Sequence, residues 1–149
     1  MKTQLTWTGN MKFSSEASGN KVDMDAKPPI GQGTAMTPKE LVAAGLGGCS
    51  AMDVIALFKK HKQTPESFKI DVEVDMSQGS YPQVFTKASI SYEATGKISR
   101  DVFIEAVTLS QTKYCGVSAM LVKSFPIFYR VVLNGEVLKE GQAQFGGRQ

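Results

Sequence analysis

One long apolar segment, residues 37–58, constrains this chain more than any other feature. Its start carries the signals of a helix, because Thr37 suits the N-cap, Pro38 suits the first helical position and Glu40 completes a capping box with Thr37. Beyond this first turn the only charged residue is Asp53, and lysines follow where the helix macrodipole favours cations. A helix that is apolar on nearly all sides must be covered on every side, so the rest of the chain is expected to pack around it.

The centre of this predicted helix is rich in glycine. Gly45, Gly47 and Gly48 precede Cys49, and each glycine costs about 1 kcal/mol relative to alanine in a helix interior. Two explanations are open. The small residues allow another backbone to pack closely, or they mark a functional site, where local preferences are often violated.

Length and composition are those of an ordinary globular protein. The 149 residues are 42% hydrophobic and 21% charged, which excludes disordered and disulfide-rich classes. We expect one domain over residues 1–149, with a flexible, polar and glycine-rich tail at 141–149. The net charge of +3 is small and the basic residues are scattered among acids, so nucleic acid is not an expected partner.

The predicted location is the cytoplasm. Residues 1–5 lead directly into a strand-like pattern, without the apolar core or the cleavage site of a signal peptide. Asp53 interrupts the most apolar segment, which leaves no run of the about 18 residues that suggest a membrane span, and we expect no membrane association. In the cytoplasm, two cysteines are more typical of free thiols or a cycling pair than of a permanent disulfide.

Alternating apolar residues and turn sequences predict strands on both sides of the first helix. Three short strands at 4–8, 11–16 and 21–25 are expected to form an antiparallel meander, and the loop at 27–33 leads to the helix. The remaining expected elements are a hairpin of strands at 69–76 and 84–93, a second helix that is capped by Ser99 and ends at Phe125, a strand at 127–133 and a returning strand at 136–138.

The expected fold class is α+β, with antiparallel sheets packed around two central helices. Both helices are largely apolar, and the few short strands of one chain cover one side of each helix more easily than both. We therefore expect an intertwined homodimer, with the helices central and the sheets outside.

Cysteine is the only strong nucleophile candidate. Cys115 lies within the predicted second helix, as Cys49 lies within the first. The sole histidine, His61, lies at a lysine-rich helix end, which excludes a multi-histidine metal site and makes a Cys-His dyad depend on one solvated residue. We expect neither a metal nor a cofactor. Asp53, a lone acid in an apolar segment, is expected to be structural, bonded to a helix cap or to a lysine across the dimer.

Each cysteine also has a plain interpretation as a small buried hydrophobic residue. Because Cys49 and Cys115 lie on helices expected to pack together, each beside a glycine, the thiols could instead meet and cycle between dithiol and disulfide. A static disulfide would stabilise the fold by roughly 4 kcal/mol, but the cytoplasmic setting argues against that use.

Two segments resemble a known family. Residues 38–54 (PKELVAAGLGGCSAMDV) and 114–118 (YCGVS) are similar to the two cysteine-bearing segments of the OsmC/Ohr family of osmotically induced and organic-hydroperoxide-resistance proteins. The resemblance covers nearly the whole chain. It implies an intertwined α+β homodimer and a thiol peroxidase in which Cys49 attacks a small hydrophobic peroxide and Cys115 captures the sulfenic acid. It also implies a dithiol reductant of the lipoyl type.

This sequence departs from the family's pattern at two positions that activate the thiol. A peroxidatic thiol must ionise, which usually requires a nearby cation or a helix N-terminus, and Cys49 lies about three turns from the start of its helix. In the peroxidase members an N-terminal arginine and a glutamate directly after the helix-starting proline activate the thiol. Here the first arginine is Arg100, and Lys39 follows the proline. Candidates to replace the arginine are Lys21, Lys27, Lys39 and Arg100, and candidates to support the site are Glu40, Lys39 and Asp53.

The sequence thus predicts a thiol-dependent redox enzyme that reduces organic hydroperoxides. The alternative is a non-enzymatic protein that binds a small hydrophobic or lipoyl-type ligand in the dimer groove, with the cysteines only lining it. The missing arginine and glutamate favour this alternative.

Overall fold

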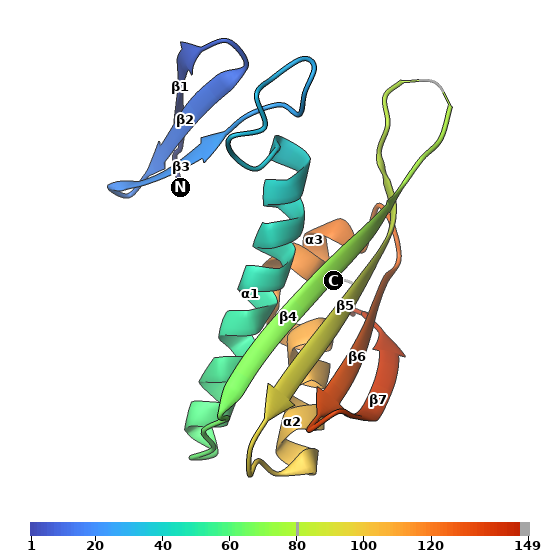
Figure 1. Cartoon of the computed structure of the whole chain (residues 1–149). Coiled ribbons are helices and arrows are strands. Elements are labelled where there is room, and N and C mark those ends of the chain that lie inside the picture. The colour runs from blue at the N-terminus through green and yellow to red at the C-terminus, as the bar shows by residue number, and fades with distance from the viewer. Residues whose placement is uncertain (80, 147–149) are drawn as a thin grey trace. The chain divides into compact units, whose positions relative to one another are not determined.

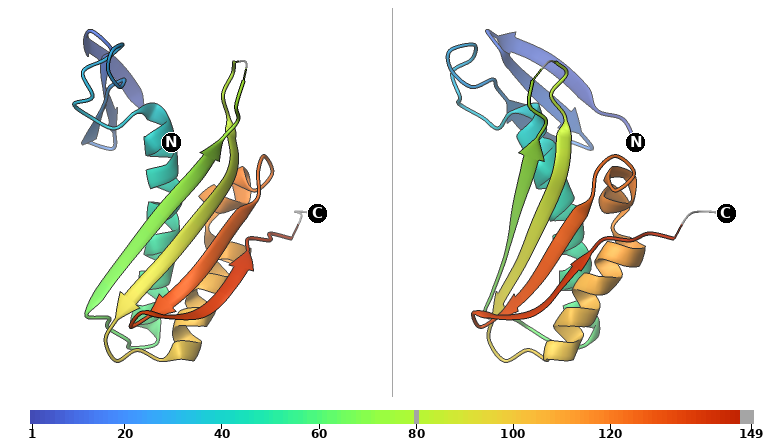
Figure 2. Two further views of the ribbon diagram at one scale, coloured as in Figure 1. Left: turned by 45° about the vertical axis from the view of Figure 1, so that its right-hand side comes forward. Right: turned by 90° about the vertical axis from the view of Figure 1, so that its right-hand side faces the viewer.

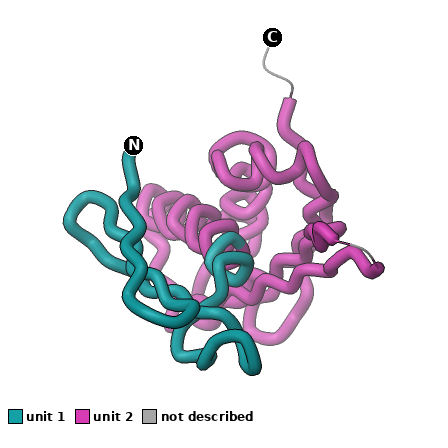
Figure 3. Tube along the Cα trace, turned by 90° about the horizontal axis from the view of Figure 1, so that it is seen from above, with its two compact units in different colours: residues 1–42 teal, residues 43–149 magenta. Residues whose placement is uncertain are grey.

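The computed structural model describes residues 1–79 and 81–146 of the chain. The chain divides into two compact units, residues 1–42 and residues 43–149, which Figure 3 distinguishes by colour.

The first unit is built on a three-stranded antiparallel sheet. Its strands, in the order β1-β2-β3, are β1 (Gln4–Gly9), β2 (Lys12–Ala17) and β3 (Asn20–Met24). The two connecting turns place Asn10 (φ 48°) and Ser18 (φ 51°) in the left-handed region, which tight hairpins require. The predicted meander is confirmed.

The helix that follows begins as the sequence predicts. In helix α1 (Pro38–Lys60), the Thr37 backbone N–H donates to Glu40 Oε2 at 2.8 Å, and the Glu40 backbone N–H donates to Thr37 Oγ1 at 3.2 Å. These two bonds form the reciprocal capping box and satisfy two backbone donors that a helix start leaves free. Glu40 Oε1 also forms an ion pair with Lys27 Nζ at 2.7 Å.

We expect this capping box to make stability depend on pH. The hydrogen bond with Lys27 and the bonds with Thr37 lower the pKa of Glu40 from 4.5 to about 2. Because the pKa is lower in the folded state, the stabilisation is complete above about pH 4.5 and is lost as the pH falls towards 2. Chemical denaturation at stepped pH should show a shallower acid loss for Glu40→Gln than for the wild type. The control is Glu73→Gln on an exposed position of the second unit, and equal acid slopes in the wild type and Glu40→Gln would contradict the prediction.

The second unit is a four-stranded sheet with helices on one face (Figures 1 and 2). The strand order is β4-β5-β6-β7, and β5 pairs with β6 in parallel while the outer pairs are antiparallel. The parallel pair differs from the wholly antiparallel sheets that we expected, because the helices between β5 and β6 carry the chain back to the same end of the sheet. The elements of this unit, apart from α1, are β4 (Ser67–Met76), β5 (Phe85–Thr95), α2 (Arg100–Leu109), the π-helical turn η1 (Ser110–Tyr114), α3 (Gly116–Leu121), β6 (Ile127–Leu133) and β7 (Glu136–Gln142).

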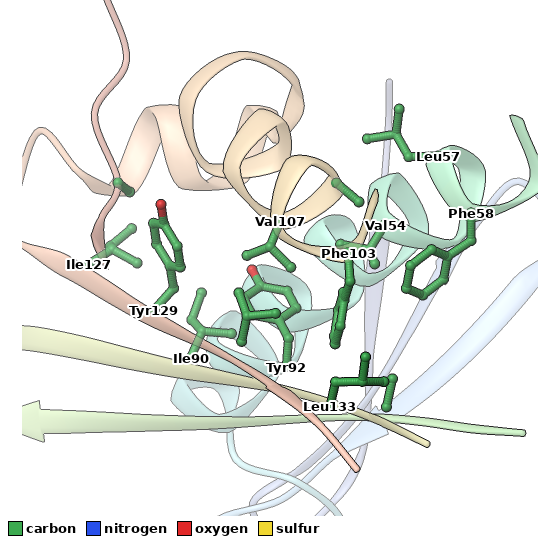
Figure 4. Close-up of a cluster of buried hydrophobic side chains, with 14 of the residues drawn as sticks. Val54, Leu57, Phe58, Ile90, Tyr92, Phe103, Val107, Ile127, Tyr129 and Leu133 are labelled. Atoms are coloured by element: carbon green, nitrogen blue, oxygen red, sulfur yellow. The ribbon is translucent and has the colours of Figure 1, made fainter. Parts of the chain in front are cut away.

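The core of the second unit lies between this sheet and the helices α1 and α2 (Figure 4). Phe58 of α1 and Phe103 of α2 are buried with their ring centroids 5.3 Å apart, and Phe68 of β4 closes the cluster. The strands contribute alternate residues, which is the pattern of a sheet with one covered face. The fully buried large side chains from the strands are Ile90, Tyr92, Ile127 and Val131.

The glycines of α1 have different surroundings. A Cβ atom on Gly47 would lie 2.8 Å from Val72 Cγ2 of β4, so this glycine allows the helix to approach the sheet. A Cβ atom on Gly45 or Gly48 would meet no atom within 4 Å. Of the two explanations that the sequence left open, close packing accounts for Gly47, and the contact is with a strand.

Helix α1 is the one helix of the described residues that is long and apolar enough to cross a membrane by length and composition, with a mean hydropathy of 1.8. The expectation that no segment reaches this threshold was therefore wrong, because a single aspartate does not offset the apolar residues around it. In its most apolar stretch of 18 residues, one third of the helix is buried. The buried residues of α1, among them Leu46, Val54 and Phe58, belong to the core of the second unit.

Two further expectations need correction. The predicted second helix is interrupted, because α2 ends at Leu109, η1 follows, and Cys115 has an extended backbone (φ −68°, ψ 102°) before α3 begins. Residues 141–149 are not a tail throughout, because Gly141 and Gln142 belong to β7 and Ala143 is buried. Tyr129 stacks over Gly141 on the neighbouring strand, where a Cβ would lie 2.6 Å from the ring. Residues 147–149 of the predicted tail lie outside the described residues.

Candidate functional site

The structure brings the two cysteine thiols together. Cys49 lies on α1 and is partly exposed, whereas Cys115 lies between η1 and α3 and is fully buried. Both are free thiols, and the side chain of Cys49 is close enough to hydrogen-bond with that of Cys115. A partly exposed thiol beside a buried thiol is an arrangement in which one sulfur meets a reagent and the other can attack the product.

The immediate surroundings of Cys115 are polar as well as buried. Its sulfur is the N-cap acceptor of α3, and it receives hydrogen bonds from the Ser118 backbone N–H at 3.3 Å and from Ser118 Oγ at 3.1 Å. Burial raises the pKa of the Cys115 thiol, the two bonds from Ser118 oppose that rise, and the adjacent Cys49 adds to it. Cys115 is therefore held as a protonated thiol at neutral pH.

A cluster of buried polar side chains joins the two cysteine-bearing segments. Ser50, next to Cys49, bonds through Oγ to Ser110 Oγ at 2.7 Å and to the Tyr92 hydroxyl at 2.5 Å. The Gln111 amide donates from Nε2 to Ser50 Oγ at 2.9 Å and to the Tyr92 hydroxyl at 2.8 Å. Burial raises the pKa of the Tyr92 hydroxyl, which keeps it protonated. We call Ser50, Asp53, Tyr92, Ser110 and Gln111 the polar cluster.

Asp53 forms the end of the polar cluster. Its Oδ2 accepts a hydrogen bond from Ser110 Oγ at 2.9 Å, and Ser110 is the C-cap residue of α2, so the expected bond to a helix cap is confirmed. Partial burial raises the pKa of Asp53, and the bond from Ser110 opposes that rise. Asp53 is one helical turn from Cys49 and takes part in the site, whereas the other two candidates for support lie in the first unit.

Those two candidates are Glu40 and Lys39, in the first turn of α1. Glu40 is bonded to Thr37 and Lys27, and Lys39 is exposed. The other proposed cations have acidic partners. Lys21 lies 3.5 Å from Glu16, and Arg100 forms a bidentate pair with Glu136 at 2.6 and 2.7 Å. Arg100 begins α2 and Ser110 follows its end, so about 15 Å of helix separates this arginine from the polar cluster.

The remaining candidates do not form a metal site or a histidine dyad. His61 Nε2 lies 3.8 Å from Glu105 Oε2, in the turn after α1 and about three helical turns from Cys49. Within the described residues, no group of three or more metal-ligating side chains occurs.

Sequence reasoning identified the two cysteines and Asp53 but missed the side chains that join them. Tyr92 and Gln111 had no pattern that indicated a site. Ser110 and Ser118 carried a signal that could have been used, because both occur in the apolar stripe of the predicted second helix. A serine at a core-facing position requires a hydrogen-bond partner, so each predicted a nearby polar group.

The fold and the paired thiols define a two-cysteine α+β protein of the OsmC class. The sequence matches the OsmC-like protein family over residues 31–129, and the chain belongs to that family. It is 33% identical over 132 residues to the protein YhfA of Escherichia coli K12, an alignment that covers 85% of this chain and 93% of YhfA.

Solved structures share the fold. A hypothetical protein from Aquifex aeolicus VF5 superposes with a TM-score of 0.75 at 26% identity, over 89% of this chain and 93% of that chain. An organic hydroperoxide resistance protein OsmC from Legionella pneumophila superposes with a TM-score of 0.63 at 16% identity, over 89% and 94% of the two chains. The identity to the Legionella protein is low, so that likeness concerns the fold.

Proposed function

We propose that this protein is a cysteine-based peroxidase that reduces organic hydroperoxides. The observation that carries the proposal is the partly exposed Cys49 thiol beside the buried Cys115 thiol. Family membership supports it, because a structural neighbour is described as an organic hydroperoxide resistance protein. The proposal places the reaction in the cytoplasm, where the resting state is the dithiol.

The reaction proceeds in three steps. The Cys49 thiolate attacks the terminal oxygen of the hydroperoxide, the O–O bond breaks, and the alcohol leaves with a proton while Cys49 becomes a sulfenic acid. The Cys115 sulfur then attacks the Cys49 sulfur, and the hydroxyl group leaves as water when the disulfide forms. Two electrons pass from the two thiols to one hydroperoxide. A dithiol reductant, such as a lipoyl group, returns two electrons and two protons by thiol–disulfide exchange.

The arrangement of the two thiols suits these separate roles. Cys49 is the accessible sulfur, so it is the one that a peroxide meets. Cys115 is buried and protonated, which protects it from direct oxidation until the sulfenic acid forms beside it. The exposed large apolar residues of the second unit, among them Met52 and Met120, offer contact to a hydrophobic peroxide or to a second copy of the chain.

We also propose that the protein is a homodimer. In the second unit the outward side of α1 carries Gly45, Gly48 and Met52, and the Met52 side chain is 75% exposed. In the first unit one face of the sheet exposes Leu5, Trp7, Phe13 and Val22. Apolar surfaces of this kind on a soluble chain mark interaction sites, and a second copy is the partner that the family suggests.

The test of the peroxidase is a stoichiometric titration of the reduced protein with an organic hydroperoxide. We expect one equivalent of hydroperoxide to consume both thiols and to yield a disulfide between Cys49 and Cys115 in peptide mapping. Cys115→Ser should consume one equivalent but stop at the sulfenic acid, which a carbon-acid reagent traps. Oxidation without this disulfide would contradict the proposal.

The competing candidate is the non-enzymatic binder of a hydrophobic or lipoyl-type ligand. The observation in its favour is that Lys21, Lys27 and Arg100, three of the four cations proposed to activate Cys49, have acidic partners of their own. Wild-type protein that does not react with hydroperoxide, together with lipoamide binding that survives replacement of both cysteines by serine, would establish the binder instead.

A further inference from the structure

We infer that Ser50, Ser110 and Gln111 are positioning residues for the thiol pair, and that their hydrogen bonds hold η1 against α1 so that Cys115 faces Cys49. The inference deepens the proposed function and rests on it for its biological meaning. It concerns the step in which Cys115 attacks an oxidised Cys49.

The polar cluster is linked to both cysteines through the backbone. Ser50 follows Cys49 in α1. The Cys115 backbone N–H donates to the Ser110 carbonyl at 3.0 Å, and this bond closes η1. The side chains of Ser50 and Ser110 are themselves bonded, at 2.7 Å. The hydrogen bond between Ser50 and Ser110 therefore connects the α1 backbone next to Cys49 to η1, the turn that positions Cys115.

Counting donors gives the cluster a single direction. Gln111 is a donor to both Ser50 Oγ and the Tyr92 hydroxyl oxygen, and because these two oxygens are only 2.5 Å apart, one amide N–H is shared between them. Ser110 gives its only hydroxyl hydrogen to Asp53 Oδ2, so Ser50 must donate to Ser110 and Tyr92 must donate to Ser50. Every O–H in the chain thus points towards the Asp53 carboxylate. A fully oriented chain has few alternative arrangements, which makes it rigid.

Gln111 indicates that the role of the polar cluster is to fix the geometry of the thiol pair more than to stabilise the fold. Its side chain is fully buried, and its Oε1 atom has no hydrogen-bond partner among the described residues. An unsatisfied buried acceptor costs about 1–3 kcal/mol, a penalty that a leucine of similar size would avoid. A buried polar group that costs stability in the fold is better explained by the geometry that it fixes.

The π-helical turn shows what that geometry is. In an α-helix the Cys115 N–H would bond to the Gln111 carbonyl, but here it bonds to Ser110, and the Gln111 carbonyl accepts from the Gln144 backbone N–H at 3.1 Å. Such turns are rare and occur frequently at functional sites. Relaxation to an α-helical turn would rotate the Cys115 side chain by about 100° around the helix axis. The polar cluster opposes this relaxation, because Ser50, Asp53 and Tyr92 hold the side chains of the two turn residues, Ser110 and Gln111, in place by hydrogen bonds.

The experiment follows the thiols with a chromogenic aryl disulfide and needs no peroxide. The partly exposed Cys49 attacks the reagent and releases one aryl thiolate in a bimolecular phase. Cys115 then attacks the mixed disulfide at Cys49 and releases the second aryl thiolate in a phase that is independent of reagent concentration. Cys115→Ser, which should show only the first phase, identifies the two steps.

We expect Ser110→Ala and Gln111→Leu to slow the second phase by at least about tenfold, because misplacement of a reacting group by about 1 Å costs up to a hundredfold in rate. The first phase should stay within about twofold of the wild type. The matched control is Thr112→Val, which removes a hydroxyl of the same turn that donates to the Thr108 carbonyl at 2.8 Å and lies outside the polar cluster. This control should leave both phases unchanged.

Several outcomes would overturn the inference. An unchanged second phase in both variants would show that the cluster does not position Cys115, and an equal slowing of both phases with a loss of folding would show a merely structural role. A wild-type protein with a fast second phase but no reaction with hydroperoxide would contradict the proposed function and leave the positioning role standing. A wild-type protein without a second phase would contradict both.

Discussion

Replacement of Cys49 by serine is expected to abolish hydroperoxide consumption, with a loss of at least about a thousandfold in rate. A serine hydroxyl has the same shape as the thiol and is slightly smaller, but it ionises far above neutral pH and forms no sulfenic acid, so neither oxidation nor disulfide formation can begin. The packing around residue 49 should tolerate the change, because the side chain is only partly buried. The measurement is the decay of an organic hydroperoxide in the presence of reduced lipoamide.

The control for this experiment is Cys115→Ser under the same conditions. Without Cys115 the protein should complete one oxidation and then turn over slowly, because an external thiol must replace the missing internal one. The two cysteine variants therefore differ in the first turnover, which Cys49→Ser lacks and Cys115→Ser retains. A Cys49→Ser protein that consumes hydroperoxide at the wild-type rate would exclude Cys49 as the nucleophile.

The second large effect is expected at the outward side of α1. Met52→Lys should convert the proposed homodimer into a monomer, because an interface that covers this 75% exposed side chain would have to bury an unpaired charge. Such a charge costs several kcal/mol, which raises the dissociation constant by at least about a hundredfold. Sedimentation equilibrium across a range of protein concentrations measures the change.

Val137→Lys is the control for the dimer experiment, because Val137 of β7 is also exposed, at 50%, and carries the same change of charge. It should leave the mass unchanged. The thermal unfolding of the isolated Met52→Lys chain should show a folded protein, since Met52 belongs to no part of the buried core. A wild-type protein that sediments as a monomer at all concentrations would contradict the homodimer itself.

Local features of the fold were predictable because their causes are local. The capping box of Thr37 and Glu40 depends on residues three apart, and the alternation in β4 and β5 depends on the two-residue period of a strand. The Asn134-Gly135 hairpin is formed by two residues that both adopt positive φ. These signals gave the element order and most of the boundaries.

The break before Cys115 was not predictable in the same way. Residues 99–121 continue a helical apolar pattern, and nothing in the order of residues marks the π-helical turn. The turn depends on partners distant in sequence: Ser50 is 60 residues from Ser110, and Gln144 binds the carbonyl of Gln111. The parallel pairing of β5 with β6 likewise depends on where the intervening helices lie.

The sequence by itself determined that this protein has an apolar, glycine-containing helix around Cys49, a second thiol on a later segment and an α+β order of elements. Periodicity, capping and turn chemistry are sufficient for these features because each acts within a few residues. Only the tertiary structure decided that the thiols meet, that Gly47 allows helix α1 to pack against strand β4, and that an oriented chain of buried hydroxyls ends on Asp53. Contacts between distant segments decide such features, because a buried polar group is satisfied by whichever side chain the fold places beside it.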